Sequence, residues 1–189
     1  MPLPDQFPVL TSERLVLREM ADRDLDALFE MESDPIAMRY WSKLPVRELD
    51  EARATLERAK RTLADRVGIR WSITRREEDS MLGHVSMFEF SEQNRRAEIG
   101  YGLLRRHWGQ GYMHEALIAV IGYAFGPLGL HRLEADIHPG NAASLRALER
   151  LGFAREGHLR ERWHVGEEIS DSVLLGLLAA QWRAGGAGR

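Results

Sequence analysis

The spacing of apolar side chains changes period several times along the 189-residue chain, and each change marks an expected element. Near the N-terminus, Leu15 and Leu17 alternate with Val16 and Arg18, which is typical of a short strand. After Asp22, a residue type that favours helix starts, apolar positions recur every three or four residues and predict a helix. Beyond position 68 the period returns to two. The first half of the chain is therefore expected to enter a sheet, leave it for helices and return.

The complete pattern predicts seven strands and four helices in the order β-α-α-β-β-β-α-β-α-β-β. An antiparallel run followed by one βαβ crossover predicts an α/β domain with a mixed, mostly antiparallel sheet and helices on both faces. We expect this single domain to span 10–179, with flexible tails at 1–9 and 184–189. The expected strands are 14–19, 69–73, 81–90, 96–104, 132–138, 153–165 and 169–178, and the expected helices follow Asp22, cover 47–66, follow the HWGQGY loop, and run from Asn141 to about Leu151.

Composition excludes several classes of function. The net charge is −3, so nothing favours a nucleic-acid partner. The chain has no cysteine, which excludes disulfides, thiolate zinc sites, iron–sulfur clusters and a cysteine nucleophile. Its start lacks a secretory signal, and no apolar run approaches the ~18 residues of a membrane helix. We therefore expect a cytoplasmic protein with no membrane partner.

The residues Arg106 to Gly111 have the form R-x-x-G-x-G and lie between an expected strand and an expected helix. A helix start offers unpaired amide groups, and glycines let an anion approach them, so the segment is suited to bind a pyrophosphate. The alternative is a purely steric turn. Other glycine-rich signatures are absent: there is no G-x-x-x-x-G-K-[ST], and Arg105 breaks the dinucleotide pattern that Gly100 and Gly102 would begin.

A second signal follows about thirty residues later, where Asn141-Ala-Ala-Ser144 opens a helix that ends in LERLGF. With the segments AEIGYGLLRRHWGQGYMHEAL (97–117) and HPGNAASLRALERLGFAREGHLRERW (138–163), the chain resembles the GCN5-related N-acetyltransferase (GNAT) superfamily. Within it, the chain is most similar to the RimJ/RimL type, which acetylates N-terminal amines of ribosomal proteins. The resemblance implies an acetyl-CoA-dependent N-acetyltransferase that passes the acetyl group directly to a primary amine, of a protein N-terminus or a small molecule, within a ternary complex.

The same resemblance implies which residues hold the acetyl-CoA co-substrate. The strand before the loop is expected to splay from its neighbour and to bind the pantetheine arm, and the loop amides are expected to bind the pyrophosphate. For Trp108 a packing role is the stronger alternative, and for Asn141 the alternative is a helix cap. The implied residues are Leu103, Leu104, His107, Trp108, Gly109, Gln110, Gly111, Tyr112, Met113, Asn141 and Ser144.

Catalysis is expected to need a donor for the leaving thiolate and a base for the amine. The resemblance assigns the first role to Ser144, with helix capping as the alternative. Glu98 lies one residue from Ile99, hence on the opposite face of its strand, and is the expected base, with a structural pairing to an arginine as the alternative. Where related enzymes carry a glutamate in the last hairpin, this chain has Trp163, and Glu161 is the nearest carboxylate. No metal is expected, because no H-E-x-x-H is present.

Two alternatives to an active enzyme stay open: a CoA-binding or regulatory module that has lost catalysis, and a plain interaction domain. Met38, Tyr40 and Trp41 follow the first helix and are expected either to pack or to form a substrate rim. The acceptor amine and a homodimeric state are not fixed by the sequence.

Overall fold

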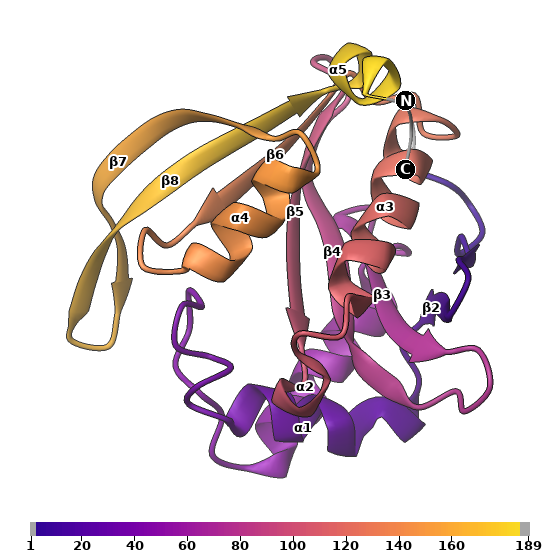
Figure 1. Cartoon of the computed structure of the whole chain (residues 1–189). Coiled ribbons are helices and arrows are strands. Elements are labelled where there is room, and N and C mark those ends of the chain that lie inside the picture. Colours follow the sequence, from indigo (N-terminus) through magenta and orange to yellow (C-terminus); the bar gives the residue numbers. More distant parts are fainter. Residues whose placement is uncertain (1–2, 186–189) are drawn as a thin grey trace.

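The structure, a computed structural model, describes residues 3–185, and these form one eight-stranded sheet (Figure 1). The spatial order is β1-β2-β3-β4-β5-β6-β8-β7, antiparallel throughout except between β5 and β6. The strands are β1 (Leu10–Thr11), β2 (Leu15–Glu19), β3 (Gly68–Arg75), β4 (Met81–Ser91), β5 (Arg96–Leu103), β6 (Arg132–Ile137), β7 (Ala154–Val165) and β8 (Glu168–Leu178).

The predicted fold class, a mixed and mostly antiparallel sheet with helices on both faces, is confirmed. The expected number of seven strands is wrong by one within the described residues. The additional strand is β1, in which Leu10 and Thr11 pair with Leu17 and Val16 of β2. Two residues are too few to show a period of two, so the sequence pattern could not reveal this strand.

Helices cover the sheet from both sides. On one face lie η1 (Asp22–Asp24, a 3₁₀ turn), α1 (Leu25–Ser33) and α2 (Leu49–Arg61), which is shorter than the predicted 47–66. On the other face lie α3 (Tyr112–Phe125) and α4 (Ala142–Arg150), both in front of the sheet in Figure 1. A 3₁₀ turn, η2 (Arg105–His107), precedes α3, and a last helix that the pattern did not predict, α5 (Ala179–Ala184), follows β8.

The apolar core consists of two clusters that the sheet separates. The larger cluster joins α3 and α4 to the sheet around the fully buried Trp71. The smaller cluster lies under α1 and α2. Part of the expected N-terminal tail contacts the larger cluster: Leu3 is buried, Phe7 packs edge-on against Trp71, and the Trp71 indole N–H donates to the Pro8 carbonyl at 2.7 Å. Residues 1–2 and 186–189 of the expected tails lie outside the described residues.

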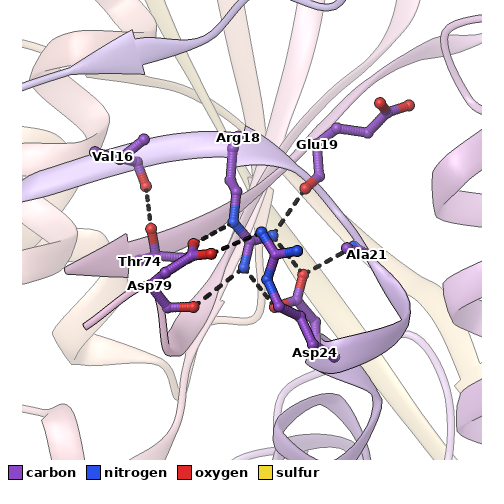
Figure 2. A network of polar contacts seen from close by, with 8 residues as sticks. Val16, Arg18, Glu19, Ala21, Asp24, Thr74 and Asp79 are labelled. Carbon is purple, nitrogen blue, oxygen red and sulfur yellow. Dashed lines mark hydrogen bonds and ion pairs between the residues drawn. The ribbon is translucent and has the colours of Figure 1, made fainter. Parts of the chain in front are cut away.

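A polar network fixes the start of α1 against the sheet (Figure 2). The Arg18 guanidinium on β2 binds both oxygens of the buried Asp24 carboxylate, at 2.7 and 2.8 Å, and Asp79 in the β3–β4 turn. Asp24 in turn accepts the Ala21 amide at 3.0 Å. The network thereby joins β2 and the start of α1, which are neighbours in sequence, to the β3–β4 turn, 61 positions further along the chain.

No helix among residues 3–185 is both long and apolar enough to cross a membrane.

Candidate active site

Strand β5 sends alternate side chains to opposite faces of the sheet, and this alternation organises the candidate site. Glu98, Gly100 and Gly102 face the side of α1, where a Cβ atom on Gly102 would lie 2.7 Å from the Trp41 ring. Tyr101 faces the side of α3 and α4 and packs against the larger core cluster. One strand thus presents a carboxyl group on one face and a phenol on the other. The prediction that Glu98 and Ile99 lie on opposite faces is confirmed.

A cavity of about 380 Å³ lies beside the Glu98 face of β5. Its floor consists of β3, β4 and β5, including Tyr101, and its walls come from the segment after α1, the end of β6, the start of α4 with Asn141 and Ser144, and the β7–β8 hairpin. Tyr40 and Trp41 line it, whereas Met38 is buried in the protein. A volume of this size is at the small end of the range for small-molecule sites.

Strands β5 and β6 separate beside this cavity. Within the described residues, they pair only over Arg96–Glu98 and Arg132–Glu134, and beyond Glu98 the β6-facing edge of β5 has no ladder partner. Figure 1 shows β6, together with β8 and β7, turning away from β5 at this point. The expected divergence of the strand before the loop is therefore present. Two expected contacts have internal partners: the Leu104 amide donates to Leu82, and the Leu103 carbonyl accepts the Trp108 indole N–H at 2.9 Å.

The glycine loop leaves a run of free amides at the start of α3. Gly109 and Gly111 have φ of +72° and +81°, in the left-handed region where a side chain is strained. No atom lies within 4 Å of a Cβ built on Gly109, so the space beside this backbone is open. Within the described residues, the amides of 109–113 donate no hydrogen bond, which fits the expected anion cradle.

Two amides of the expected set are excluded from this run. The amide of His107 donates to Leu104 and that of Trp108 donates to Arg105, because η2 forms there. Trp108 is 46% exposed and its indole N–H is bound to the Leu103 carbonyl, so part of its side chain packs against the protein. The loop amides available to an anion are therefore those from Gly109 onward.

Positive charge surrounds this loop. Arg14 binds the Gln110 carbonyl at 3.1 Å and lies 4.7 Å from the centre of the Tyr112 ring, and Arg75 stacks over the same ring at 5.6 Å. Burial raises the pKa of Glu115 in the first turn of α3, but the hydrogen bond from Ser12 and those from Arg14, at 2.7 Å, outweigh burial and lower it. The positive charge of Arg14 thus offsets the negative charge of Glu115 beside the helix start.

The start of α4 brings Ser144 to Tyr101. The Asn141 side chain caps the helix by accepting the Ser144 amide at 3.2 Å. The Ser144 hydroxyl is not used as a cap; it donates to the Tyr101 phenol oxygen at 3.0 Å. Burial raises the pKa of Tyr101 to about 12, so the phenol stays protonated at neutral pH. Because its oxygen accepts from Ser144, its own proton is free to be donated elsewhere.

Glu98 is a titratable carboxyl group without a fixed partner. Within the described residues it forms no hydrogen bond or ion pair, so the expected alternative of a structural pairing to an arginine is not present. Burial, and next the negative charge of Asp136, raise the pKa of Glu98 to about 7. Arg162 opposes this shift but is bound to Asp136 at 2.7 Å. A carboxyl group that ionises near neutral pH and faces a cavity can accept a proton from a substrate.

The final hairpin contributes a wall and no second base. Glu161 is exposed on a bulge of β7 with φ of +51°, and it does not line the cavity. Trp163 does line it, and its indole donates to Asp136 at 3.3 Å. His138 lines the cavity too, with Nδ1 bound by the Gly140 amide and its ring 4.9 Å from that of Tyr40. Among residues 3–185 no cluster of three or more His, Asp or Glu could hold a metal ion.

Two features of the site escaped the sequence pattern. Tyr101 lies in the expected strand 96–104, and although it stands between two glycines, the sequence does not predict it as the partner of Ser144. Arg70 and His84, which also line the cavity, follow the alternation of ordinary strands and gave no signal. Arg70 lies on β3 and His84 on β4, and the order of the strands in the sheet must be known before either residue can be placed beside the cavity.

The chain is similar to known proteins in both sequence and structure. The acetyltransferase (GNAT) domain family matches residues 14–154. The uncharacterised N-acetyltransferase YoaA of Bacillus subtilis is 34% identical over 155 residues, which cover 82% of this chain and 88% of YoaA. The [ribosomal protein uS5]-alanine N-acetyltransferase of Escherichia coli is 34% identical over 87 residues, 46% of this chain and 45% of that protein. The spermidine N-acetyltransferase of Vibrio cholerae, solved with CoA and spermine, superimposes with a TM-score of 0.78 at 22% identity, covering 89% and 98%.

Proposed function

This chain belongs to the GNAT family of acetyl-CoA-dependent N-acetyltransferases, and from that premise we propose that it acetylates a primary amine that enters the cavity beside Glu98. The observation that supports this most is the arrangement of β5, with a carboxyl group of raised pKa on the cavity face and the Tyr101–Ser144 pair on the other face. The transfer takes place in a ternary complex, without a covalent enzyme intermediate.

The residues at the start of α3 and along β5 fit a CoA ester. Acetyl-CoA supplies an activated acetyl thioester when it is bound. The free amides from Gly109 to Met113, with Arg14 and Arg75 nearby, would hold its pyrophosphate, and the unpaired edge of β5 beyond Glu98 would hold its pantetheine arm. The two left-handed glycines keep the approach to the amides clear.

Glu98 prepares the acceptor on the cavity side. An amine attacks only when neutral, so the ammonium must lose a proton, and the Glu98 carboxylate accepts it directly or through one water molecule. A pKa of about 7 lets the group be ionised before the reaction and still hold the proton afterwards.

Tyr101 and Ser144 act on the opposite face. The phenol proton that Ser144 leaves free is donated as a hydrogen bond to the departing sulfur. Neither hydroxyl is a strong acid, so their contribution is stabilisation of the charge that develops on the leaving group. The first proton of the ammonium thus goes to Glu98 on one side of β5, while the hydrogen bond from Tyr101 stabilises the departing thiolate on the other. The second proton, which the nitrogen loses as the amide forms, neutralises the thiolate and gives free CoA thiol.

An acceptor screen with free thiol as the readout tests this function. The purified chain is incubated with acetyl-CoA and a panel of amines that includes peptides with free N-termini, polyamines and amino acids. We expect thiol release with at least one class, abolished by Gly111→Val and reduced at least tenfold by Ser144→Ala. Background hydrolysis without acceptor is the control.

Titration calorimetry with CoA separates the outcomes. Tight binding of CoA with no thiol release from any amine would overturn the enzymatic function and leave a CoA-binding module. Absence of CoA binding by the wild-type chain would overturn the assignment of the loop as well.

A further inference from the structure

The two ends of the cavity carry opposite charge. Glu98 and Asp136 lie at the β5–β6 end, whereas Arg70 lines the cavity from β3, two strands away. Arg70 pairs across the sheet with Ser86, and Ser86 pairs with Gly100, so all three point to the face of Glu98. At ~4.8 Å per strand, the backbones of Arg70 and Gly100 are about 10 Å apart.

The residues of the cavity floor between these two ends have small side chains or none. Ser86 is small and Gly100 has no side chain, so the row from Arg70 to β5 is not filled by the protein itself. A Cβ on Gly100 would already come within 3.2 Å of the Phe88 ring. A ligand lying along this row would contact Glu98 at one end and Arg70 at the other.

Arg70 lacks a full counter-charge. Its side chain is only 18% exposed, its Nε has no hydrogen-bond partner among the described residues, and Nη2 lies 3.7 Å from Glu32, longer than a hydrogen bond. Lys43 shares that buried carboxylate at 2.8 Å, and Arg58 adds positive charge nearby. Burial of the Arg70 guanidinium lowers its pKa. Because one carboxylate, Glu32, is shared by the two cations Lys43 and Arg70, this cluster keeps a net charge of +1.

His84 does not compensate this charge. His84 lies on the same face of β4 as Ser86, two residues away, and is 2% exposed. Neither of its ring nitrogens has a hydrogen-bond partner within residues 3–185. Burial, Arg70 and Lys43 hold its pKa well below the usual value, so the ring is neutral at pH 7. The end of the cavity near Arg70 therefore has an unmatched positive charge.

We propose that the acceptor is a small aminocarboxylate, whose carboxylate binds Arg70 while its amine faces Glu98. This substrate class rests on the function proposed above. A guanidinium binds a carboxylate through two parallel hydrogen bonds, which fixes orientation as well as affinity. A diamine of the same length is disfavoured, because its second ammonium would meet the cationic end of the cavity.

Matched acceptors test this class on the intact protein. Thiol release is measured with amino acids, with their carboxamides, which keep the amine and lose the anion, and with 1,4-diaminobutane. Hydrogen bonds to a charged group contribute ~1.5–3 kcal/mol, which corresponds to about 10- to 150-fold. We expect kcat/KM to be higher by that factor for the amino acids than for their carboxamides, and the diamine to be the poorest acceptor.

Arg70→Gln should remove this preference. The KM for the amino acid should rise at least tenfold, while the values for its carboxamide and for acetyl-CoA stay within about twofold. The variant retains the Lys43–Glu32 pair, so no buried carboxylate is left alone. Arg39→Gln is the matched control: it removes a neighbouring positive charge that stacks on Tyr40 but does not line the cavity.

Calorimetric titration of amino acid and carboxamide into the CoA-bound protein gives a readout that does not depend on turnover. Equal binding of the two, equal kcat/KM values, or an Arg70→Gln variant that keeps the preference would each overturn the aminocarboxylate. Thiol release with diamines or peptides only would overturn it too, and would leave the proposed acetyltransferase function standing.

Discussion

Replacing Glu98 by Gln changes one property of the site, its ability to hold and release a proton. The side chain keeps its length, and no hydrogen bond or ion pair among the described residues is lost with the charge. The perturbation is informative because burial and Asp136 raise the pKa of Glu98 to about 7. In the wild-type protein about half of the molecules are then ionised at pH 7 and almost all at pH 9.

The effect on activity follows from this ionisation. General base catalysis is typically worth ~10²–10⁴-fold, so we expect kcat/KM of Glu98→Gln to fall at least 100-fold at pH 8 to 9. Below pH 7 the difference should shrink about tenfold per pH unit, because the wild-type carboxyl group becomes protonated. The ammonium group of the acceptor titrates in both proteins, so the ratio of their kcat/KM values isolates the titration of Glu98.

The effect on stability has the opposite sign. The folded Glu98 holds its proton up to about pH 7 and the unfolded one only to about 4.5, so the folded state binds more protons between these values and the free energy of unfolding falls as the pH rises. At ~1.4 kcal/mol per pKa unit this gap in pKa would amount to about 3.5 kcal/mol, and solvent contact at the cavity reduces it to about 1–2 kcal/mol. Glutamine avoids this cost above pH 7.

The two effects are measured separately. Urea unfolding at pH 4.5 and pH 8 should show Glu98→Gln as more stable than wild type at pH 8 by about 1–2 kcal/mol and closer to it at pH 4.5, and pH profiles of thiol release should show the lost acidic limb. Glu161→Gln, which removes an exposed carboxylate, is the control. A variant with the wild-type pH profile would refute the role as base, and one that is less stable than wild type at pH 8 would refute the unpaired carboxylate.

Three further outcomes are expected. Ser144→Ala and Tyr101→Phe should each lower kcat at least tenfold with little change in the KM for acetyl-CoA, and the double variant should fall no further; additive losses would mean that the two hydroxyls act separately. Gly111→Val should remain folded, at a cost of about 1–2 kcal/mol for its positive φ, and lose CoA binding in calorimetry; wild-type affinity would make the loop a steric turn only. Arg18→Met should lower the free energy of unfolding by about 3 kcal/mol because it strands the buried Asp24, whereas the exposed Arg23→Met should cost less than about 1 kcal/mol; similar losses would contradict the network in Figure 2.

The parts of the fold and site that sequence could predict depend on local signals. The strand–loop–helix around Gly109 and Gly111, and the cap at Asn141, are each set by residues a few positions apart. The opposite orientation of Glu98 and Ile99 follows from strand geometry alone. The physical causes are a positive φ, a free helix amide and the pleat of a strand, and each of them acts within one segment of the chain.

The remaining features depend on segments brought together by the fold. The bond between Ser144 and Tyr101 joins residues 43 positions apart, and it requires α4 to lie over β5. The alignment of Arg70 with Gly100 requires the register of two strand pairs at once. Similarly, η2 uses the amides of His107 and Trp108, which a pattern of glycines could not reveal. The resemblance to a family is enough to identify the glycine loop, whereas the residues that line the acceptor cavity are identified only from the three-dimensional structure.

The segment Glu98-Ile-Gly-Tyr-Gly102 shows how one strand can carry both halves of the proposed chemistry. Its β4 edge is fully paired and holds it rigid, while its β6 edge is open beyond Glu98. Any side chain at position 100 would press on Phe88, and one at 102 would strike Trp41 at 2.7 Å, so glycine at both keeps the cavity clear. Glu98, the proposed base, and Tyr101 of the proposed hydroxyl pair are consequently three positions apart on opposite faces, with an open edge between them. A sheet strand, whose side chains alternate, provides this separation of proton acceptor and donor, and a helix of the same length would not.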